Sequence, residues 1–205
     1  MLTIEERAKD IYRNYIEVIC PYVMHYELLA NEFPVEILNE IRAIFTHMSK
    51  YYLSDDALKK ENDLSKAEGH IKRSILDCYK YICMAYDDKY SEFERMYRRV
   101  DLSFVDNGEF LPKLLEARKK AVDQMLDARK SDVSIISDEN IADDDLYSKY
   151  EKAFVTYSSV YELINKSYKK LENLRKKAIL KDFLAVGGWV IGIIGIALTI
   201  ISFFF

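Results

Sequence analysis

Residues 183–205 read FLAVGGWVIGIIGIALTIISFFF, a run of 23 residues without a charged side chain. At roughly 1.5 Å per residue, a helix of this length can cross the about 30 Å of hydrocarbon in a bilayer. Inside lipid the backbone polar groups must be satisfied within the segment itself, as they are in a helix. The run therefore predicts a C-terminal transmembrane helix, with a buried core helix as the alternative. We expect the residues before it to lie on one side of the membrane.

Small residues gather on one face of this predicted helix. At roughly 100° per residue they fall within about 80° of its circumference, and they are Gly188, Gly192, Gly195, Thr199 and Ser202. Small residues let membrane helices pack closely, although glycine is also simply frequent in such helices. We interpret the stripe as a surface for self-association, so a homo-oligomer is expected. That the assembly encloses a pore and permeabilises the membrane is a further hypothesis.

Basic residues cluster directly before the uncharged run: Lys166, Lys169, Lys170, Arg175, Lys176, Lys177 and Lys181. An excess of Lys and Arg beside a membrane span marks its cytoplasmic side. Such residues also attract anionic lipid headgroups, at about 1 kcal/mol each near the surface. The cluster predicts a single-pass protein of the inner or cytoplasmic membrane with its N-terminal domain in the cytoplasm. An RNA-binding patch is the competing interpretation.

The composition of the remaining chain favours long helices. Only six glycines and three prolines occur, and four of the glycines lie in the uncharged run. The formal charge of −4 does not suggest wholesale coating of nucleic acid, and DNA is not an expected partner. The three cysteines include no CxxC pair, which indicates reduced thiols facing the cytosol.

Helical periodicity divides the chain into segments. Thr3 to Glu6 match a capping box, and Pro21 is expected to kink or break the first helix near Ile19. Further helices are predicted at about 22–29, 34–52, 56–100, 112–130 and from 146 onward. We therefore predict an all-α bundle of about five helices, of which the last is a long stalk that continues into the membrane. The predicted parts are a helical bundle over residues 1–131, an acidic linker over 132–145, the stalk over 146–182 and a transmembrane tail over 183–205. The stalk and the tail are expected to form one helix without a break.

Two heptad series run through the predicted stalk. They are Tyr147, Phe154, Tyr161 and Tyr168, and Tyr150, Tyr157, Ile164, Leu171 and Ala178. A sustained spacing of seven residues is typical of a coiled-coil or bundle seam. Tyrosine is too bulky for a tight dimer at so many seam positions. We expect the seam to pack against the domain's own helices or within a larger oligomer.

Polar residues share faces of the helices predicted at 34–52 and 56–100. Glu36, Glu40 and His47 align on one helix, and His70, Arg73 and Asp77 align on the other. If these helices form an antiparallel hairpin, the two stripes meet in a cluster of two histidines, one arginine and two or three carboxylates. Such a cluster is either a network of hydrogen bonds in which every polar group has a partner and which stabilises the hairpin, or a functional site. The sequence holds no pattern of metal ligands and no phosphate-binding glycine loop, so no metal or cofactor is expected.

Arg42 and His47 form an R-x4-H motif behind Glu40. The pattern E-x-R-x4-H, followed by A-x-x-H-x-x-R-x-x-x-D, covers residues 40–77 and resembles the HEPN superfamily. That resemblance implies a metal-independent RNase site formed by Arg42 and His47, usually completed across a dimer. The residue after the arginine is usually polar in that family and is Ala43 here. Residues five apart on a straight helix point about 140° apart, so the two side chains converge only through a distorted helix or a second chain.

With its predicted membrane segment, the chain is similar in architecture to small membrane-associated HEPN-like accessory proteins of RNA-targeting CRISPR systems. That likeness implies a membrane-bound oligomer that enhances antiviral defence, with an RNA-guided nuclease or RNA as partner. A non-catalytic adaptor that docks a soluble partner at the membrane is the alternative, and an RNA endonuclease is the third. Of these functions, we favour the non-enzymatic ones.

Overall fold

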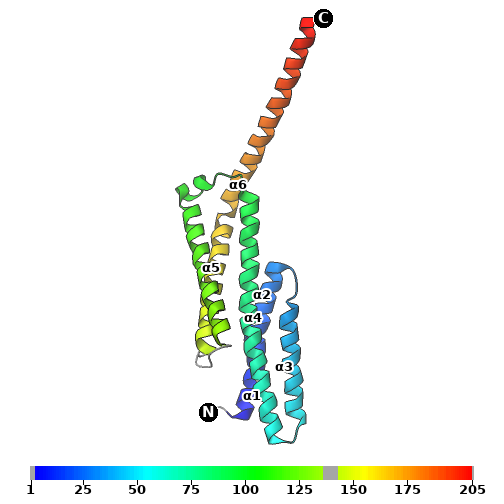
Figure 1. The fold of residues 1–205 in the computed structure, drawn as a ribbon, viewed down its shortest axis with the longest axis vertical. Helices are drawn as coiled ribbons and strands as arrows, with labels where there is room; N and C mark the ends of the chain where they lie inside the picture. The colour runs from blue at the N-terminus through cyan, green and yellow to red at the C-terminus, as the bar shows by residue number, and fades with distance from the viewer. Residues whose placement is uncertain (1–2, 136–142, 205) are drawn as a thin grey trace. The chain divides into compact units, whose positions relative to one another are not determined.

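The structure is a computed structural model that describes residues 3–135 and 143–204. All regular secondary structure in these residues is helical, which confirms the predicted all-α class. The described residues form six α-helices, where the sequence predicted about five (Figure 1). Their bounds are α1 Ile4–Asn14, α2 Cys20–Ala30, α3 Val35–Leu53, α4 Ala57–Tyr97, α5 Phe110–Ile135 and α6 Asp143–Phe204. A π-helix, η1, covers Tyr15–Ile19, and two 3-10 turns, η2 and η3, cover Leu102–Phe104 and Asp106–Gly108.

The start of α1 carries the predicted capping box. The Thr3 hydroxyl accepts a hydrogen bond from the Glu6 amide at 3.2 Å, and the Thr3 amide donates to the Glu6 carboxylate at 2.7 Å. Two amides that have no partner inside the helix are thereby satisfied. The local sequence therefore fixes where the first helix begins.

The first helix changes near Ile19, as predicted from Pro21: α1 ends at Asn14 and α2 begins at Cys20. The π-helix η1 precedes it, and the Cys20 amide donates to the Tyr15 carbonyl in the wider hydrogen-bond pattern of that element. Pro21 then lies in the first turn of α2, where a missing amide proton costs no helical hydrogen bond. A single wide turn thus accommodates the proline without an intervening loop.

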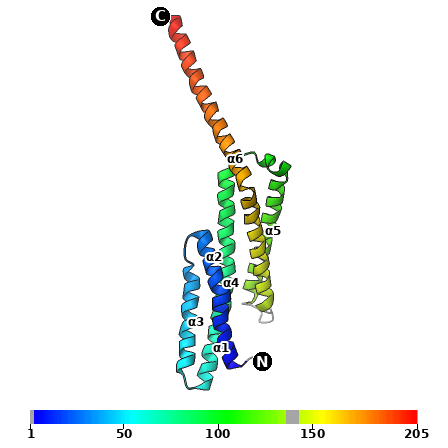
Figure 2. The ribbon, with the colours of Figure 1, turned by 180° about the vertical axis from the view of Figure 1, so that it is seen from behind.

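The chain forms two compact units, which we describe separately. Unit 1 consists of Met1–Tyr90 and Ala117–Tyr161, and unit 2 consists of Ser91–Glu116 and Glu162–Phe205. In unit 1, both views place α4 between α3 on one side and α5 with α6 on the other (Figures 1 and 2). Since α4 has neighbours on both sides, it contributes to two hydrophobic cores.

One core of unit 1 joins α1, α2 and α3 to the first half of α4. It includes Ile11, Ile37, Ile44, Met48 and Leu64. The other core lies between α2, a later part of α4, α5 and α6. It includes Ile82, Met125, Tyr150 and Tyr157. Burial of these apolar groups is the main force that holds the helices together.

The predicted heptad seam packs inside the chain itself. Tyr150 and Tyr157 are buried in unit 1, and Leu171 is buried in unit 2. Tyr168 differs from these residues, because its side chain is 55% exposed. The packing confirms the expectation that the seam meets the chain's own helices. Part of the predicted acidic linker is also helical: 132–135 belong to α5 and 143–145 to α6, while 136–142 lie outside the described residues.

In unit 2, the chain turns at Asp106–Gly108, between α4 and α5. Asp106, Asn107 and Gly108 have positive φ angles of 49°, 55° and 88°, a region that asparagine, aspartate and glycine tolerate best. Asp106 forms an ion pair with Lys170 of α6. Glu172 of α6 accepts hydrogen bonds from Tyr97 at 2.8 Å and from Arg175 at 2.9 Å. Two residues predicted to contact headgroups, Lys170 and Arg175, therefore have carboxylate partners within unit 2.

The last part of unit 2 is the continuation of α6, which runs without interruption to Phe204 as the sequence predicted. Within the part of the chain that the structure describes, no helix is long and apolar enough to cross a membrane. Residues Thr199 and Ser202 of the small-residue stripe lie outside the described side chains.

Candidate functional site

The α3–α4 hairpin brings the two predicted polar stripes together. His47 on α3 lies with its Nδ1 atom 2.8 Å from an oxygen of Asp63 on α4. His70 on α4 lies with its Nδ1 atom 2.7 Å from an oxygen of Glu40 on α3. Each histidine thus crosses to a carboxylate of the other helix. We call Glu40, His47, Asp63, His70 and Arg73 the histidine cluster.

The two imidazole rings of the histidine cluster stack on each other. Their centroids are 5.4 Å apart and their planes differ by 19°. Their side chains are 17% and 18% exposed, so the pair is shielded but reachable from solvent. Arg73 lies at the exposed side of the cluster, with its Nε atom 3.5 Å from Glu40. The Arg73 side chain is 59% exposed, so a ligand that approaches from solvent can reach its guanidinium.

The hydrogen bonds assign the ring protons. His70 Nδ1 lies near both the Glu40 carboxylate and an Arg73 nitrogen, at 2.7 Å and 3.0 Å. A ring nitrogen either donates or accepts, and an ionised carboxylate only accepts, so Nδ1 carries the proton and donates to Glu40. The same reasoning places a proton on Nδ1 of His47, which donates to Asp63. The Nε2 atom of each ring is then left for acid–base chemistry or ligand binding.

Four of the predicted residues meet in this cluster, and two lie elsewhere. Glu36 hydrogen-bonds Tyr81, and burial together with this contact raises the pKa of Tyr81 to about 12. Asp77 lies 3.5 Å from Lys80, and burial raises its pKa above the usual range. These two carboxylates belong to other contacts of α4 and do not extend the histidine cluster.

Asp63 is the member that the sequence analysis missed. It precedes His70 by seven residues on α4, which places it on the same face two turns earlier. This spacing of seven residues could have predicted that Asp63 lies on the same face as His70. Asp63 bonds His47 across the hairpin, so its role depends on the register of the two helices.

The structure places Arg42 apart from the histidine cluster. Its side chain is exposed and forms no hydrogen bond or ion pair with the described residues, and only its carbonyl oxygen is bonded, by Thr46. The α-helix α3 runs regularly from Val35 to Leu53, so no distortion turns Arg42 towards His47. Their convergence would require a second copy of the chain.

The described residues include no group of three or more His, Cys, Asp or Glu side chains placed to hold a metal ion. The histidine cluster offers two oriented imidazoles and one guanidinium. Imidazoles transfer protons near neutral pH, and guanidinium binds phosphate and carboxylate oxygens. The arrangement suits acid–base chemistry on an anionic substrate.

The end of α6 is the second candidate site, because large apolar side chains there are exposed. More than half of each side chain is accessible at Phe183, Leu184, Trp189, Ile191, Ile193, Ile194, Ile196 and Leu198. A Cβ atom added at Gly188 or Gly192 would meet nothing within 4 Å. The surface of this segment is thus open to lipid or to another chain.

No protein-family model, curated protein or solved structure matches the chain. The function is therefore inferred from the chain's own residues and geometry.

Proposed function

We propose that the chain is a membrane-anchored helical protein that acts as an effector or accessory protein of antiviral defence and self-associates through the end of α6. The observation that carries the anchor is the exposure of the large apolar side chains from Phe183 to Leu198. At roughly 100° per residue, they are distributed around most of the helix. A helix that is apolar on all sides belongs in a protein core or in a membrane. The defence role rests on the HEPN-like resemblance of residues 40–77.

Basic residues support this placement of α6. Lys169, Lys176, Lys177 and Lys181 are exposed and form no ion pair with the described residues. They lie directly before the uncharged run, where anionic headgroups would surround them. We propose a single-pass protein of the cytoplasmic membrane with the helical units on the cytoplasmic side.

Alkaline extraction of membranes tests the anchor. The full chain is expected to stay in the membrane pellet, because apolar burial in lipid resists a wash that removes proteins bound by charge. A chain recovered in the alkaline supernatant would contradict the proposal.

Self-association is proposed to use the glycine face of α6. We expect Gly192→Leu to weaken association by about tenfold, since the larger side chain separates helices that pack closely at glycine. Ile193→Phe is the matched control, because it adds bulk on the opposite face. Cross-linking of the two variants in membranes measures the effect, and equal cross-linking would exclude the glycine face. Dye release from vesicles by the wild type and not by Gly192→Leu would further support a pore.

The histidine cluster favours a second candidate function, the metal-independent cleavage of RNA. One imidazole would take the proton from a 2′-hydroxyl, and the 2′-oxygen would attack phosphorus. The other imidazole would protonate the departing 5′-oxygen as the P–O5′ bond breaks. Arg73, beside His70, would bind the phosphate oxygens. This candidate rests on the two carboxylate-oriented rings, 5.4 Å apart, and it does not require Arg42.

The rate of cleavage of single-stranded RNA, measured in the presence of a metal chelator, tests this second function. His47→Ala and His70→Ala are each expected to lower the rate about 100-fold or more, the usual contribution of an acid–base group. His47→Asn keeps a hydrogen bond to Asp63 without acid–base chemistry and should be equally inactive. Arg42→Ala is the control, since it removes a nearby charge outside the cluster. Loss of activity in Arg42→Ala would instead favour a HEPN-type site completed by two chains.

A further inference from the structure

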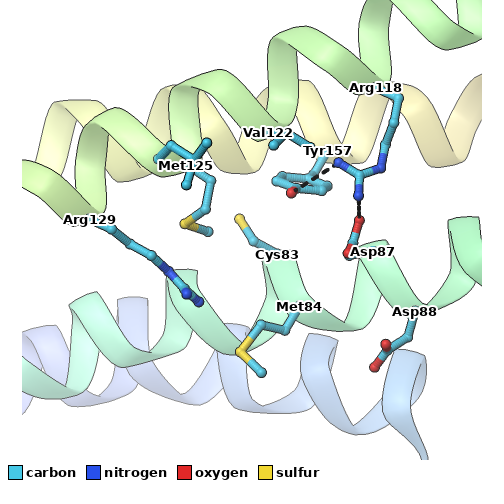
Figure 3. A pocket seen from close by; sticks show the side chains of 10 residues that line it. Cys83, Met84, Asp87, Asp88, Arg118, Val122, Met125, Arg129 and Tyr157 are labelled. Carbon is cyan, nitrogen blue, oxygen red and sulfur yellow. Dashed lines mark hydrogen bonds and ion pairs between the residues drawn. The ribbon is translucent and has the colours of Figure 1, made fainter.

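Unit 1 contains a cleft between α4 and α5, closed at the back by Tyr157 of α6 (Figure 3). Its volume is about 280 Å³. A cleft of this size suits a small organic molecule. The histidine cluster lies on other residues, so the cleft is a separate feature of the unit.

One end of the cleft is formed by Arg118, which the surrounding residues hold in place. Arg118 forms an ion pair with Asp87 and donates a hydrogen bond to the Tyr157 hydroxyl at 3.4 Å. Its guanidinium carbon lies 5.1 Å from the ring centre of Tyr90 and 5.4 Å from that of Tyr157. The charge of Arg118 is therefore already compensated. Its Nε atom is buried and has no acceptor among the described residues.

The other end of the cleft is formed by Arg129, an exposed residue whose charge has no carboxylate partner among the described residues. Arg129 forms no ion pair or hydrogen bond with the described residues. Figure 3 shows its guanidinium directed between the sulfur atoms of Met84 and Met125. Burial raises the pKa of the neighbouring Cys83 thiol to about 12, and the charge of Arg129 acts in the opposite direction. Asp88 also lines the cleft, but Figure 3 places it at the end away from Arg129.

The walls between the two arginines are apolar and adaptable. They are formed by Cys83, Met84, Val122, Met125 and Leu126. Methionine side chains are flexible and polarisable, so they fit apolar groups of different shapes. An apolar wall beside a cation that has no ion-pair partner suits a small amphipathic anion.

We propose that this cleft binds a small organic carboxylate with a short apolar body. The carboxylate pairs with Arg129, and the apolar body packs on Met84, Val122 and Met125. A guanidinium forms two parallel hydrogen bonds with a carboxylate, which gives the site its preference for this group. The buried Nε–H of Arg118 offers a further donor to a ligand oxygen at the far end of the cleft. This binding does not depend on the membrane anchor or on RNA cleavage.

Titration of the full chain in non-ionic detergent with hexanoate tests the proposal. The methyl resonances of Met84 and Met125 are observed by NMR and assigned from Met84→Leu and Met125→Leu. Hexanoate is expected to shift both resonances saturably, and Arg129→Gln is expected to weaken binding about tenfold, as loss of one charge-assisted contact does. Lys120→Gln is the matched control, because it removes an exposed charge of α5 outside the cleft. Its binding should equal that of the wild type.

Hexanol has the same number of carbon atoms as hexanoate but no charge, and it serves as the neutral probe. Saturable shifts with hexanoate and not with hexanol support the site. Equal binding of both compounds, or equal binding of hexanoate to Arg129→Gln, would overturn the assignment of the carboxylate to Arg129. The absence of any shift at Met84 and Met125 would overturn the site altogether.

Discussion

A chain that ends at Asp182 is expected to leave the membrane fraction and to remain folded. The removed residues, 183–205, include the exposed apolar side chains of α6, so their loss takes no buried contact from the described cores. The free energy of unfolding of the remaining units should change by less than about 0.5 kcal/mol, as for other surface changes. Fractionation measures the location, and circular dichroism with denaturant measures the stability. Any effect of the protein in cells that requires the membrane should be lost.

A second variant separates the apolar anchor from the basic cluster. Replacing Lys176, Lys177 and Lys181 by glutamine removes the attraction to headgroups, at about 1 kcal/mol per residue, but keeps the uncharged run. This variant should stay in the membrane pellet. A truncated chain that remains with the membrane, or a triple variant that leaves it, would show that charge and not apolar burial anchors the protein.

Local patterns in the sequence predicted those parts of the fold that depend on neighbouring residues. The capping box at Thr3 and the unbroken α6 are both found. Pro21 correctly predicted a change in the helix near Ile19, but the sequence analysis did not consider that the change would be a π-helix.

The histidine cluster was predicted in part because its residues repeat along two helix faces. The pairing of His47 with Asp63 and of His70 with Glu40 depends on the register of the hairpin, which helical periodicity does not give. The cleft was not predicted at all. Arg118 and Arg129 come from α5, Asp87 from α4 and Tyr157 from α6, so no local spacing connects them. Sites assembled from several helices require the packing of the cores to be known first.

Tyr150→Ala is expected to destabilise unit 1 more than any other tyrosine substitution in the heptad series. Tyr150 is fully buried, and its hydroxyl donates to Asp132 at 3.0 Å. Lys80 lies 2.8 Å from the same carboxylate and 5.4 Å from the centre of the Tyr150 ring. Removing the ring leaves a cavity between α4, α5 and α6. The ion pair of Lys80 and Asp132 then borders this cavity. The cost should be about 3–5 kcal/mol, as for other large aromatic residues in a core.

Two further substitutions show which part of Tyr150 supplies this stability. Tyr150→Phe keeps the ring and loses only the hydrogen bond to Asp132, so a cost of about 1 kcal/mol is expected. Tyr168→Ala is the matched control in the same helix, since Tyr168 is 55% exposed, and it should cost less than about 0.5 kcal/mol. Denaturant unfolding of the full chain in non-ionic detergent, followed by circular dichroism, measures all three. Similar costs for Tyr150→Ala and Tyr168→Ala would contradict an internal seam, because a seam between chains would bury both residues alike.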